Sequence, residues 1–238
     1  PVQSAIRIFR HTGGRSEIFP AHQQLYSQHF GINRQLPESA PQQRRTEQLP
    51  LYSLAKLTQM RIISGSHRGR QIFPDKNFTA RPTTDFAKEN IFNVLNNYVD
   101  IEGAAVLDLF SGTGSISYEF ASRGAKEVTA IELNYNHYSF IKRTAGEIGF
   151  RNIKVFKNDA FLACRKLKGR KFDIIFADPP YQLKNISEVP QAIFDNDLLN
   201  EAGIAIVEHP ASVDYSHHPL FFNHREYGSV NFSLFRKN

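Results

Sequence analysis

The chain has 238 residues, enough for one ordinary domain with attachments, and its formal net charge is +6. It contains no apolar run near the ~20 residues that a membrane span needs and no recognisable signal peptide, so we expect a cytoplasmic protein. The single cysteine, Cys164, excludes an internal disulfide framework, and no Cys/His cluster has metal-ligand spacing, so no metal site is predicted. Nothing in the sequence demands more than a monomer.

The positive charge is unevenly distributed. Residues 1–100 contain 13 Lys and Arg against 7 Asp and Glu, which leaves 29 − 13 = 16 basic and 23 − 7 = 16 acidic residues in 101–238. The whole excess is therefore N-terminal, where we expect an anionic polymer to bind. A merely solvated surface is the alternative reading.

Residues 1–59 differ in composition from the rest. They hold nine glutamines, against three in the remaining 179 residues, and prolines scattered at positions 20, 37, 41 and 50. This composition predicts an N-terminal extension that is poorly ordered or not native to the domain. We hypothesise that Met60, the only methionine, begins the ancestral domain.

Residues 60–99 predict a basic hairpin followed by a helix. Two strand-like runs flank a turn at 66–69 that carries basic residues. The segment 81–85 (Arg-Pro-Thr-Thr-Asp) then starts a helix, because a threonine can cap its amino terminus and Asp85 falls in the first turn. We expect this basic unit to contact the anionic polymer and to close over a ligand.

From residue 100 onward, strand-like and helix-like segments alternate. This alternation predicts an α/β fold with a doubly wound, Rossmann-like parallel sheet and right-handed crossovers. The expected strands are 105–110, 127–132, 153–157, 172–177 and 203–208, and the expected helices are 115–123, 135–148, 161–167 and 188–196.

The end of the chain, from residue 224 to 236, predicts a closing antiparallel hairpin. Two strand-like runs flank Gly228 and Ser229, and in the second run Val230, Phe232 and Leu234 alternate with residues that we expect to face outward. Such a hairpin distinguishes methyltransferases from dehydrogenases.

A glycine-rich turn, Gly112-Thr113-Gly114, follows the first core strand. Glycines allow the backbone to approach a ligand closely and to adopt positive φ. Glu132 ends the next strand, where a carboxylate can accept both hydroxyls of a ribose. These two features would suit any adenosine cofactor.

Two details favour S-adenosylmethionine over NAD. Ser117 stands where the dinucleotide fingerprint has its third glycine. Asp108 would repel a pyrophosphate but attract the ammonium group of a methionine moiety. A further carboxylate, Asp159, either accepts from the adenine amino group or caps a helix, and both roles are compatible.

The motif Asp178-Pro179-Pro180-Tyr181 follows the apolar run 172–177. The prolines stop both strand and helix, so a rigid turn lies at the carboxyl end of a strand, where open α/β sheets bind ligands. A carboxylate, a carbonyl and an aromatic ring suit acceptance of both hydrogens of an exocyclic amine and stacking on its base. Asp-Pro-Pro-Tyr is the signature of methyltransferases that modify amino groups of nucleobases; a proline-capped turn with a core tyrosine is the alternative.

With these residues in place, the chain from Met60 to its end resembles the RsmD family. The matching segments are 61–65 with 68–70, 81–85, 108–114, Glu132, 158–160, 178–181 and 207–208. The resemblance implies a class I methyltransferase domain over 100–238. It also implies methyl transfer from S-adenosyl-L-methionine to the N2 amine of one guanine in small-subunit (16S) ribosomal RNA.

The resemblance also implies site residues. Asp178, Pro179, Pro180 and Tyr181 form the catalytic motif, in which Asp178 and the Pro179 carbonyl accept from N2 and Tyr181 stacks on a flipped-out base. Cofactor contacts are expected from Asp108, Phe110, Ser111, Gly112, Thr113, Gly114, Glu132, Leu133, Asp159 and Ala160, and RNA phosphate contacts from Arg61, Arg68, Arg70 and Lys88. Arg81 and Thr83 are assigned to the cofactor carboxylate, with an RNA contact as the alternative for both. Lys88 could instead belong to the cofactor group or to neither group.

Three other functions stay open at this point. A DNA adenine N6-methyltransferase shares the Asp-Pro-Pro-Tyr motif but normally carries a separate target-recognition segment. An NAD-dependent oxidoreductase is disfavoured by Ser117 and Asp108, and a non-catalytic RNA-binding module is disfavoured by the intact motif. Which guanine is modified, and whether naked RNA or an assembling small subunit is the substrate, is left open.

Overall fold

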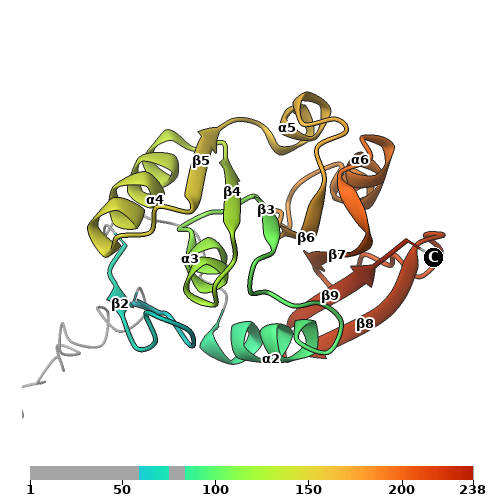
Figure 1. Cartoon of the computed structure of the whole chain (residues 1–238). Helices are drawn as coiled ribbons and strands as arrows, with labels where there is room; N and C mark the ends of the chain where they lie inside the picture. Colours follow the sequence, from blue (N-terminus) through green and yellow to red (C-terminus); the bar gives the residue numbers. More distant parts are fainter. Residues whose placement is uncertain (1–58, 75–83, 238) are drawn as a thin grey trace, which may run out of the picture. The chain divides into compact units, whose positions relative to one another are not determined.

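The computed structural model of the protein describes residues 59–74 and 84–237 (Figure 1). The predicted extension, 1–59, thus lies outside the described residues except for its last position. A seven-stranded sheet runs in the order β5-β4-β3-β6-β7-β9-β8, with β3 to β7 parallel and β9 antiparallel to both of its neighbours. The strands are β3 (Ala105–Leu109), β4 (Glu127–Glu132), β5 (Ile153–Lys157), β6 (Phe172–Ala177), β7 (Leu199–His209), β8 (Phe221–Tyr227) and β9 (Val230–Phe235).

Helices cover both faces of this sheet, as Figure 1 shows. One face packs against α2 (Asp85–Leu95), α3 (Ser115–Ser122) and α4 (Tyr135–Ile148), and the other against α5 (Ala160–Lys166) and α6 (Val189–Asp195), which follows the short 3-10 helix η1 (Ile186–Glu188). The predicted doubly wound parallel sheet closed by an antiparallel hairpin is confirmed.

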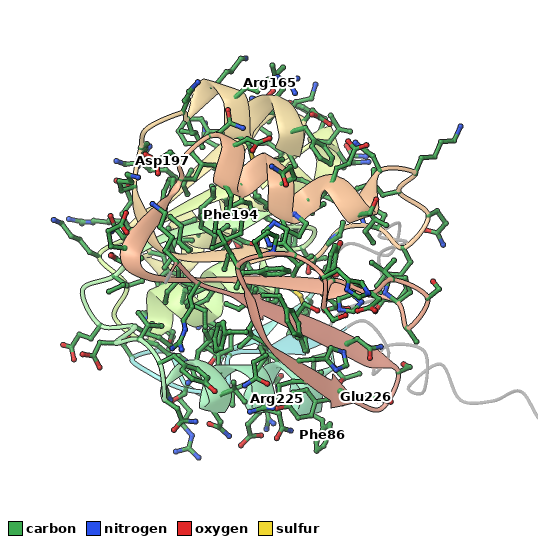
Figure 2. The ribbon with its side chains drawn as sticks, turned by 90° about the vertical axis from the view of Figure 1, so that its right-hand side faces the viewer. Phe86, Arg165, Phe194, Asp197, Arg225 and Glu226 are labelled. Atoms are coloured by element: carbon green, nitrogen blue, oxygen red, sulfur yellow. The ribbon has the colours of Figure 1, made fainter. Side chains whose placement is uncertain are left out.

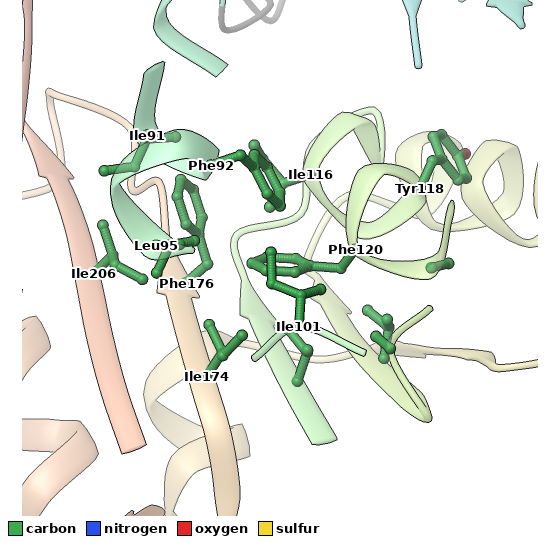
Figure 3. Close-up of a cluster of buried hydrophobic side chains, with 14 of the residues drawn as sticks. Ile91, Phe92, Leu95, Ile101, Ile116, Tyr118, Phe120, Ile174, Phe176 and Ile206 are labelled. Atoms are coloured by element: carbon green, nitrogen blue, oxygen red, sulfur yellow. The ribbon is translucent and has the colours of Figure 1, made fainter. Parts of the chain in front are cut away.

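The helix α2 joins the core through its apolar stripe. Figure 3 shows Ile91, Phe92 and Leu95 of α2 beside Phe176 of β6 and Ile206 of β7, all of them buried. Apolar residues three and four positions apart share one helix face, which explains why these three pack together. The amino-terminal end of α2 packs against β8, because the ring of Phe86 contacts that of Tyr227 edge-on. Figure 2 shows Phe86 beside Arg225 and Glu226 of the same strand.

The α2 helix begins as the sequence predicts. The side chain of Thr84 accepts a hydrogen bond from the amide of Ala87 at 3.1 Å, which is an N-cap, and Asp85 lies in the first turn. The helix ends at Leu95, one turn before Tyr98. Tyr98 instead contacts the C-terminal hairpin, because its hydroxyl accepts from Asn223 Nδ2 at 3.0 Å.

The basic hairpin has shorter strands than the sequence predicts. β1 (Met60–Arg61) and β2 (Gln71–Ile72) pair over two residues each. Ile62 still pairs across the hairpin, because its amide donates to the Arg70 carbonyl at 3.0 Å. After Ile62 the backbone binds α3 instead: the amides of Ile63 and Ser64 donate to the Glu119 carboxylate at 2.8 and 3.0 Å. The hairpin is thereby fixed to the helix that follows the glycine turn.

The outward-facing partners expected in the last strand are a second correction. All six residues of β9 are buried, including Asn231 and Ser233. β9 lies between β7 and β8, so both of its backbone edges are paired. Its side chains reach both hydrophobic clusters, one on each face of the sheet, which explains the burial of alternate residues on either face. The hydroxyl of Ser233 is satisfied by His209 Nε2 at 2.8 Å.

Candidate active site

The glycine turn and the Asp-Pro-Pro-Tyr motif emerge from neighbouring strands. β3 and β6 pair in parallel, with Leu109 opposite Ala177, so their carboxyl ends lie at the same edge of the sheet. One residue further, the amide of Asp178 donates to the carbonyl of Leu109 at 3.3 Å. The first residue of the motif is therefore attached to the last residue of the strand that leads into the turn.

The glycine turn has an unusual backbone. Phe110, Gly112 and Gly114 have φ angles of 63°, 54° and 81°, all in the left-handed region. For Phe110 this conformation is uncommon, and such strain concentrates at ligand sites when the surroundings hold it in place. The Ser111 amide, which donates to the Ile131 carbonyl at 2.9 Å, supplies one such restraint.

Glu132, at the end of β4, holds the same turn from the other side. Its carboxylate accepts from the amide of Gly112 at 2.8 Å and from the amide of Asn134 at 2.7 Å. The side chain is buried, yet a carboxylate has about four lone-pair sites and can accept further hydrogen bonds. The position fits a group that receives ribose hydroxyls while it shapes the turn.

Asp108 lies in the interior beneath the turn. It is buried on β3, and the hydroxyl of Ser117 on α3 donates to its carboxylate. Burial raises the pKa of Asp108 to about 7, although the hydrogen bonds from Ser117 and Ser111 act in the opposite direction. The residue that replaces the third fingerprint glycine thus serves as the partner of Asp108.

The residues expected at the adenine end lie after β4 and β5. Asp159 caps α5, because its Oδ1 accepts from the amide of Leu162 at 2.9 Å, which confirms the N-cap reading. Ala160 is buried, whereas Leu133 is 64% exposed. An exposed leucine beside Glu132 offers apolar surface of the kind that a purine ring covers. An adenine contact of Asp159 is compatible with the cap, since its carboxylate can accept more than one hydrogen bond.

In the Asp-Pro-Pro-Tyr motif, Pro179 is buried, Pro180 is exposed and Asp178 is half-buried. Tyr181 is 38% exposed, so it is not a core tyrosine. Its hydroxyl donates to Oε1 of Glu208, at the end of β7, at 3.0 Å. The ring is thus accessible while its hydroxyl is held.

Of the residues assigned to RNA, three arginines of the hairpin are exposed. Arg68 and Arg70 lie at and after the turn, and Arg61 pairs with Asp85 across 3.3 Å on the surface. Arg81 and Thr83 lie outside the described residues.

Lys88 is a correction, because its side chain is only 2% exposed. Nζ donates to the carbonyl of Arg61 at 2.6 Å and to the hydroxyl of Ser115 at 3.2 Å, and it lies 3.9 Å from the buried Glu119 carboxylate. Burial lowers the pKa of Lys88, opposed by the nearby Glu119. The prediction of a phosphate contact is therefore wrong for Lys88, which instead joins α2 to β1 and α3.

Sequence reasoning missed the residues on α3 that hold the hairpin. Besides Glu119, the hydroxyl of Ser122 donates to the carbonyl of Ser64 at 2.6 Å, and its own carbonyl accepts from the amide of Ser66 at 2.7 Å. One signal was available, since Glu119 precedes Arg123 by four residues and pairs with it at 2.8 Å. That spacing indicates a helix surface pair, but it does not reveal burial.

Residues 59–74 and 84–237 offer neither a metal-binding cluster nor a membrane-spanning helix. In that part of the chain, no three His, Cys, Asp or Glu side chains cluster in a way that could hold a metal ion. Among the helices of the same residues, none has the length and apolarity required to traverse a bilayer.

Comparison with known proteins gives a family and a fold. Residues 60–236 match the family described as Conserved hypothetical protein 95. Ribosomal RNA small subunit methyltransferase D of Escherichia coli is 33% identical over 152 residues, which are 63% of this chain and 74% of that protein.

Solved structures agree with this assignment. YhhF from Escherichia coli has a TM-score of 0.67 at 26% identity, covering 76% of this chain and 99% of that chain. The 16S rRNA N2 G1207 methyltransferase RsmC of Thermus thermophilus, solved with AdoMet and guanosine, shares the fold with a TM-score of 0.60 at 18% identity, over 76% of this chain and 50% of RsmC. From Met60 to its last strand, the chain therefore belongs to the Conserved hypothetical protein 95 family, the RsmD family of S-adenosylmethionine-dependent methyltransferases.

Proposed function

We propose that this protein transfers a methyl group from S-adenosylmethionine to the N2 amine of a guanine in small-subunit ribosomal RNA. The observation that carries the proposal is the Asp178 amide bonded to the Leu109 carbonyl, because it joins the amine-binding motif to the start of the glycine turn. A relative of this chain is named as a small-subunit rRNA methyltransferase, which supports the substrate class.

At the base site, the task of the protein is to orient a poor nucleophile. The guanine N2 lone pair is delocalised into the ring, and hydrogen bonds from N2 to the Asp178 carboxylate and the Pro179 carbonyl draw electron density onto nitrogen as it pyramidalises. Tyr181 stacks on the base, an interaction worth ~1–3 kcal/mol. Correct orientation of the reacting atoms can contribute ~7–11 kcal/mol.

The residues around the glycine turn fit the cofactor. S-adenosylmethionine, when bound, supplies a methyl carbon on a sulfonium that is already activated for in-line displacement. Glu132 is the acceptor for the ribose hydroxyls, Asp108 the counter-charge for the ammonium group, and Leu133 with Asp159 the adenine side. The left-handed backbone at Gly112 and Gly114 lets the chain pass close to the ligand.

In this proposal the arginines of the hairpin bind the RNA backbone. Arg68 and Arg70 are exposed on a turn that α3 holds in place, so their charges are presented from a fixed support. Contacts of this kind to phosphates position the RNA without reading its sequence. The choice of guanine must then come from RNA shape and from the base pocket.

The decisive experiment maps methylated nucleosides by mass spectrometry in small-subunit RNA from cells with and without this protein. We expect one N2-methylguanosine to disappear and to return when the purified protein is incubated with the unmethylated subunits and labelled S-adenosylmethionine. Duplex DNA is the parallel substrate. Transfer to adenine in DNA, with no change in the RNA, would contradict the proposal and favour the N6-methyltransferase reading.

A further inference from the structure

Tyr181 is restrained at both ends of its side chain. At the backbone end, Pro179 and Pro180 have fixed φ angles, and the amide of Leu183 donates to the Pro180 carbonyl at 2.8 Å, which closes a turn around Tyr181. At the far end, the hydroxyl donates to Glu208 Oε1 at 3.0 Å. The hydroxyl lies on the axis about which the ring turns, so restraint at both ends fixes the direction of that axis. Because a phenol O–H lies in the plane of its ring, the direction to the Glu208 acceptor also favours one ring plane.

Glu208 is a rigid support for that hydroxyl. It lies on β7, which is paired with β6 on one side and β9 on the other, and its own partner in β9 is Phe232. Glu208 is 6% exposed. Because Val207 lies opposite Ala177, extending the register by one residue sets Glu208 opposite Asp178. The support of the ring and the amine acceptor therefore come from equivalent positions on adjacent strands, about 5 Å apart.

We propose that Glu208 is a positioning residue, which fixes the plane of Tyr181 and through it the plane of the base that stacks there. The inference rests on the proposed function, because it assumes a base on Tyr181. A buried carboxylate forms a charge-assisted hydrogen bond, which is stronger than one to a neutral acceptor. The exposed ring face keeps its stacking area, while the anchored hydroxyl prevents rotation away from Asp178.

This role makes a specific kinetic prediction. Tyr181→Phe keeps the aromatic ring and removes its hydrogen bond to Glu208. The base should therefore still bind, but its orientation relative to Asp178 should vary more. We expect kcat to fall about tenfold or more, because small misplacements of reacting atoms are costly, while KM for the RNA stays within about threefold. The Kd of S-adenosylhomocysteine should stay within about twofold.

Variants at Glu208 test the partner. Glu208→Gln keeps a carbonyl acceptor and should retain kcat within about threefold, whereas Glu208→Ala should match Tyr181→Phe. The double variant Tyr181→Phe with Glu208→Ala should be no slower than either single one, since both remove the same bond. Tyr98→Phe is the matched control, because Tyr98 is 39% exposed and also has a hydrogen-bonded hydroxyl, but it lies after α2 and its partner is Asn223 on β8. It should leave kcat unchanged.

The substrate in every assay is small subunits from cells that lack this protein, and the product is identified by mass. Unchanged kcat in Tyr181→Phe, or losses that multiply in the double variant, would overturn the inference while leaving the proposed function intact. A wild-type protein that methylates no guanine in these particles would overturn both. Tyr181→Phe decides the matter even if Glu208→Ala fails to fold, because Tyr181 lies outside the core.

Discussion

Asp108 illustrates how one buried carboxyl group can link pH to both stability and binding. Its pKa of about 7 means that the free protein holds it part protonated at neutral pH, whereas its ordinary value is 3.8. The folded state binds this proton more tightly than the unfolded chain does. From this group alone, the free protein therefore becomes more stable as the pH falls from above 7 toward 4.

Cofactor binding should follow the opposite trend. If the carboxylate of Asp108 balances the ammonium of the cofactor, protonation removes that partner, so affinity should weaken as the pH falls. We expect the Kd of S-adenosylhomocysteine to rise between pH 8 and pH 6, by up to about tenfold per unit below 7. Calorimetric titration across this range checks it, with Asp108→Asn as the pH-independent comparison. An unchanged wild-type Kd would remove Asp108 from the ammonium site.

A variant at Asp178 should impair methyl transfer without impairing cofactor binding. Asp178→Ala removes an acceptor of the N2 hydrogens, and we expect methyl transfer to fall at least about a hundredfold, of the order seen when one group that stabilises a transition state is lost. The Kd of S-adenosylhomocysteine should change less than about threefold. Tritium transfer to small subunits and a binding titration together provide the measurement. Full activity in this variant would leave the proposed reaction without its acceptor.

At the scale of elements, the hairpin packs so closely against α3 that there is no room for a side chain at Gly65. Gly65 has a φ of 82°, and a Cβ there would overlap the carbonyl oxygen of Ser122. Gly69 has nearly the same φ, 83°, but a Cβ on it would meet nothing within 4 Å. The two glycines therefore form a matched pair that differs only in contact with α3.

Gly65→Ala should displace the hairpin and weaken RNA binding severalfold. Gly69→Ala should cost only its left-handed conformation, roughly 1–2 kcal/mol, and keep RNA affinity. Filter binding to unmethylated small subunits and thermal unfolding distinguish the two effects. Equal loss of RNA binding in both variants would mean that the packing of the hairpin against α3 does not control the affinity for RNA.

The exposed arginines and the buried lysine should differ in salt dependence. Arg68→Ala and Arg70→Ala should each reduce the slope of log affinity against log salt by roughly 0.7–0.9, because one phosphate contact is lost. Lys88→Met should leave that slope unchanged and lower the unfolding temperature, since it leaves the buried Glu119 without its ammonium neighbour. A reduced slope in Lys88→Met would restore its original assignment to RNA.

The sequence was a good guide where periodicity is local and a poor one where burial depends on distant partners. Strands β4, β5 and β6 and helix α4 have the predicted bounds, because apolar runs and caps lie within each segment. The burial of Lys88 arises from Glu119, 31 positions away, and the anchor of Tyr181 from Glu208, 27 positions away. The buried polar residues of β9 were also missed, since the layers that cover both faces of this strand come from distant segments of the chain.

At the scale of the whole molecule, the domain from Met60 onward should be self-sufficient. The Met60 side chain is buried, and its sulfur accepts from the hydroxyl of Thr113 at 2.8 Å, so β1 contributes directly to the glycine turn. The family match starts at this same residue. We expect a chain that starts at Met60 to unfold cooperatively and to bind S-adenosylhomocysteine like the full chain, as judged by calorimetry. Failure to fold would show that the preceding residues are structurally required.

The place of β9 between β7 and β8 also has a consequence for biosynthesis. Residues 230–235 are made after every other strand of the sheet, yet they occupy an internal position. Until these residues have left the ribosome, β7 presents an unpaired edge, and the phenylalanines that pack around β9 stay uncovered. Such intermediates are prone to aggregate, so this protein should depend on chaperones during vectorial synthesis more than a sheet whose last strand is peripheral.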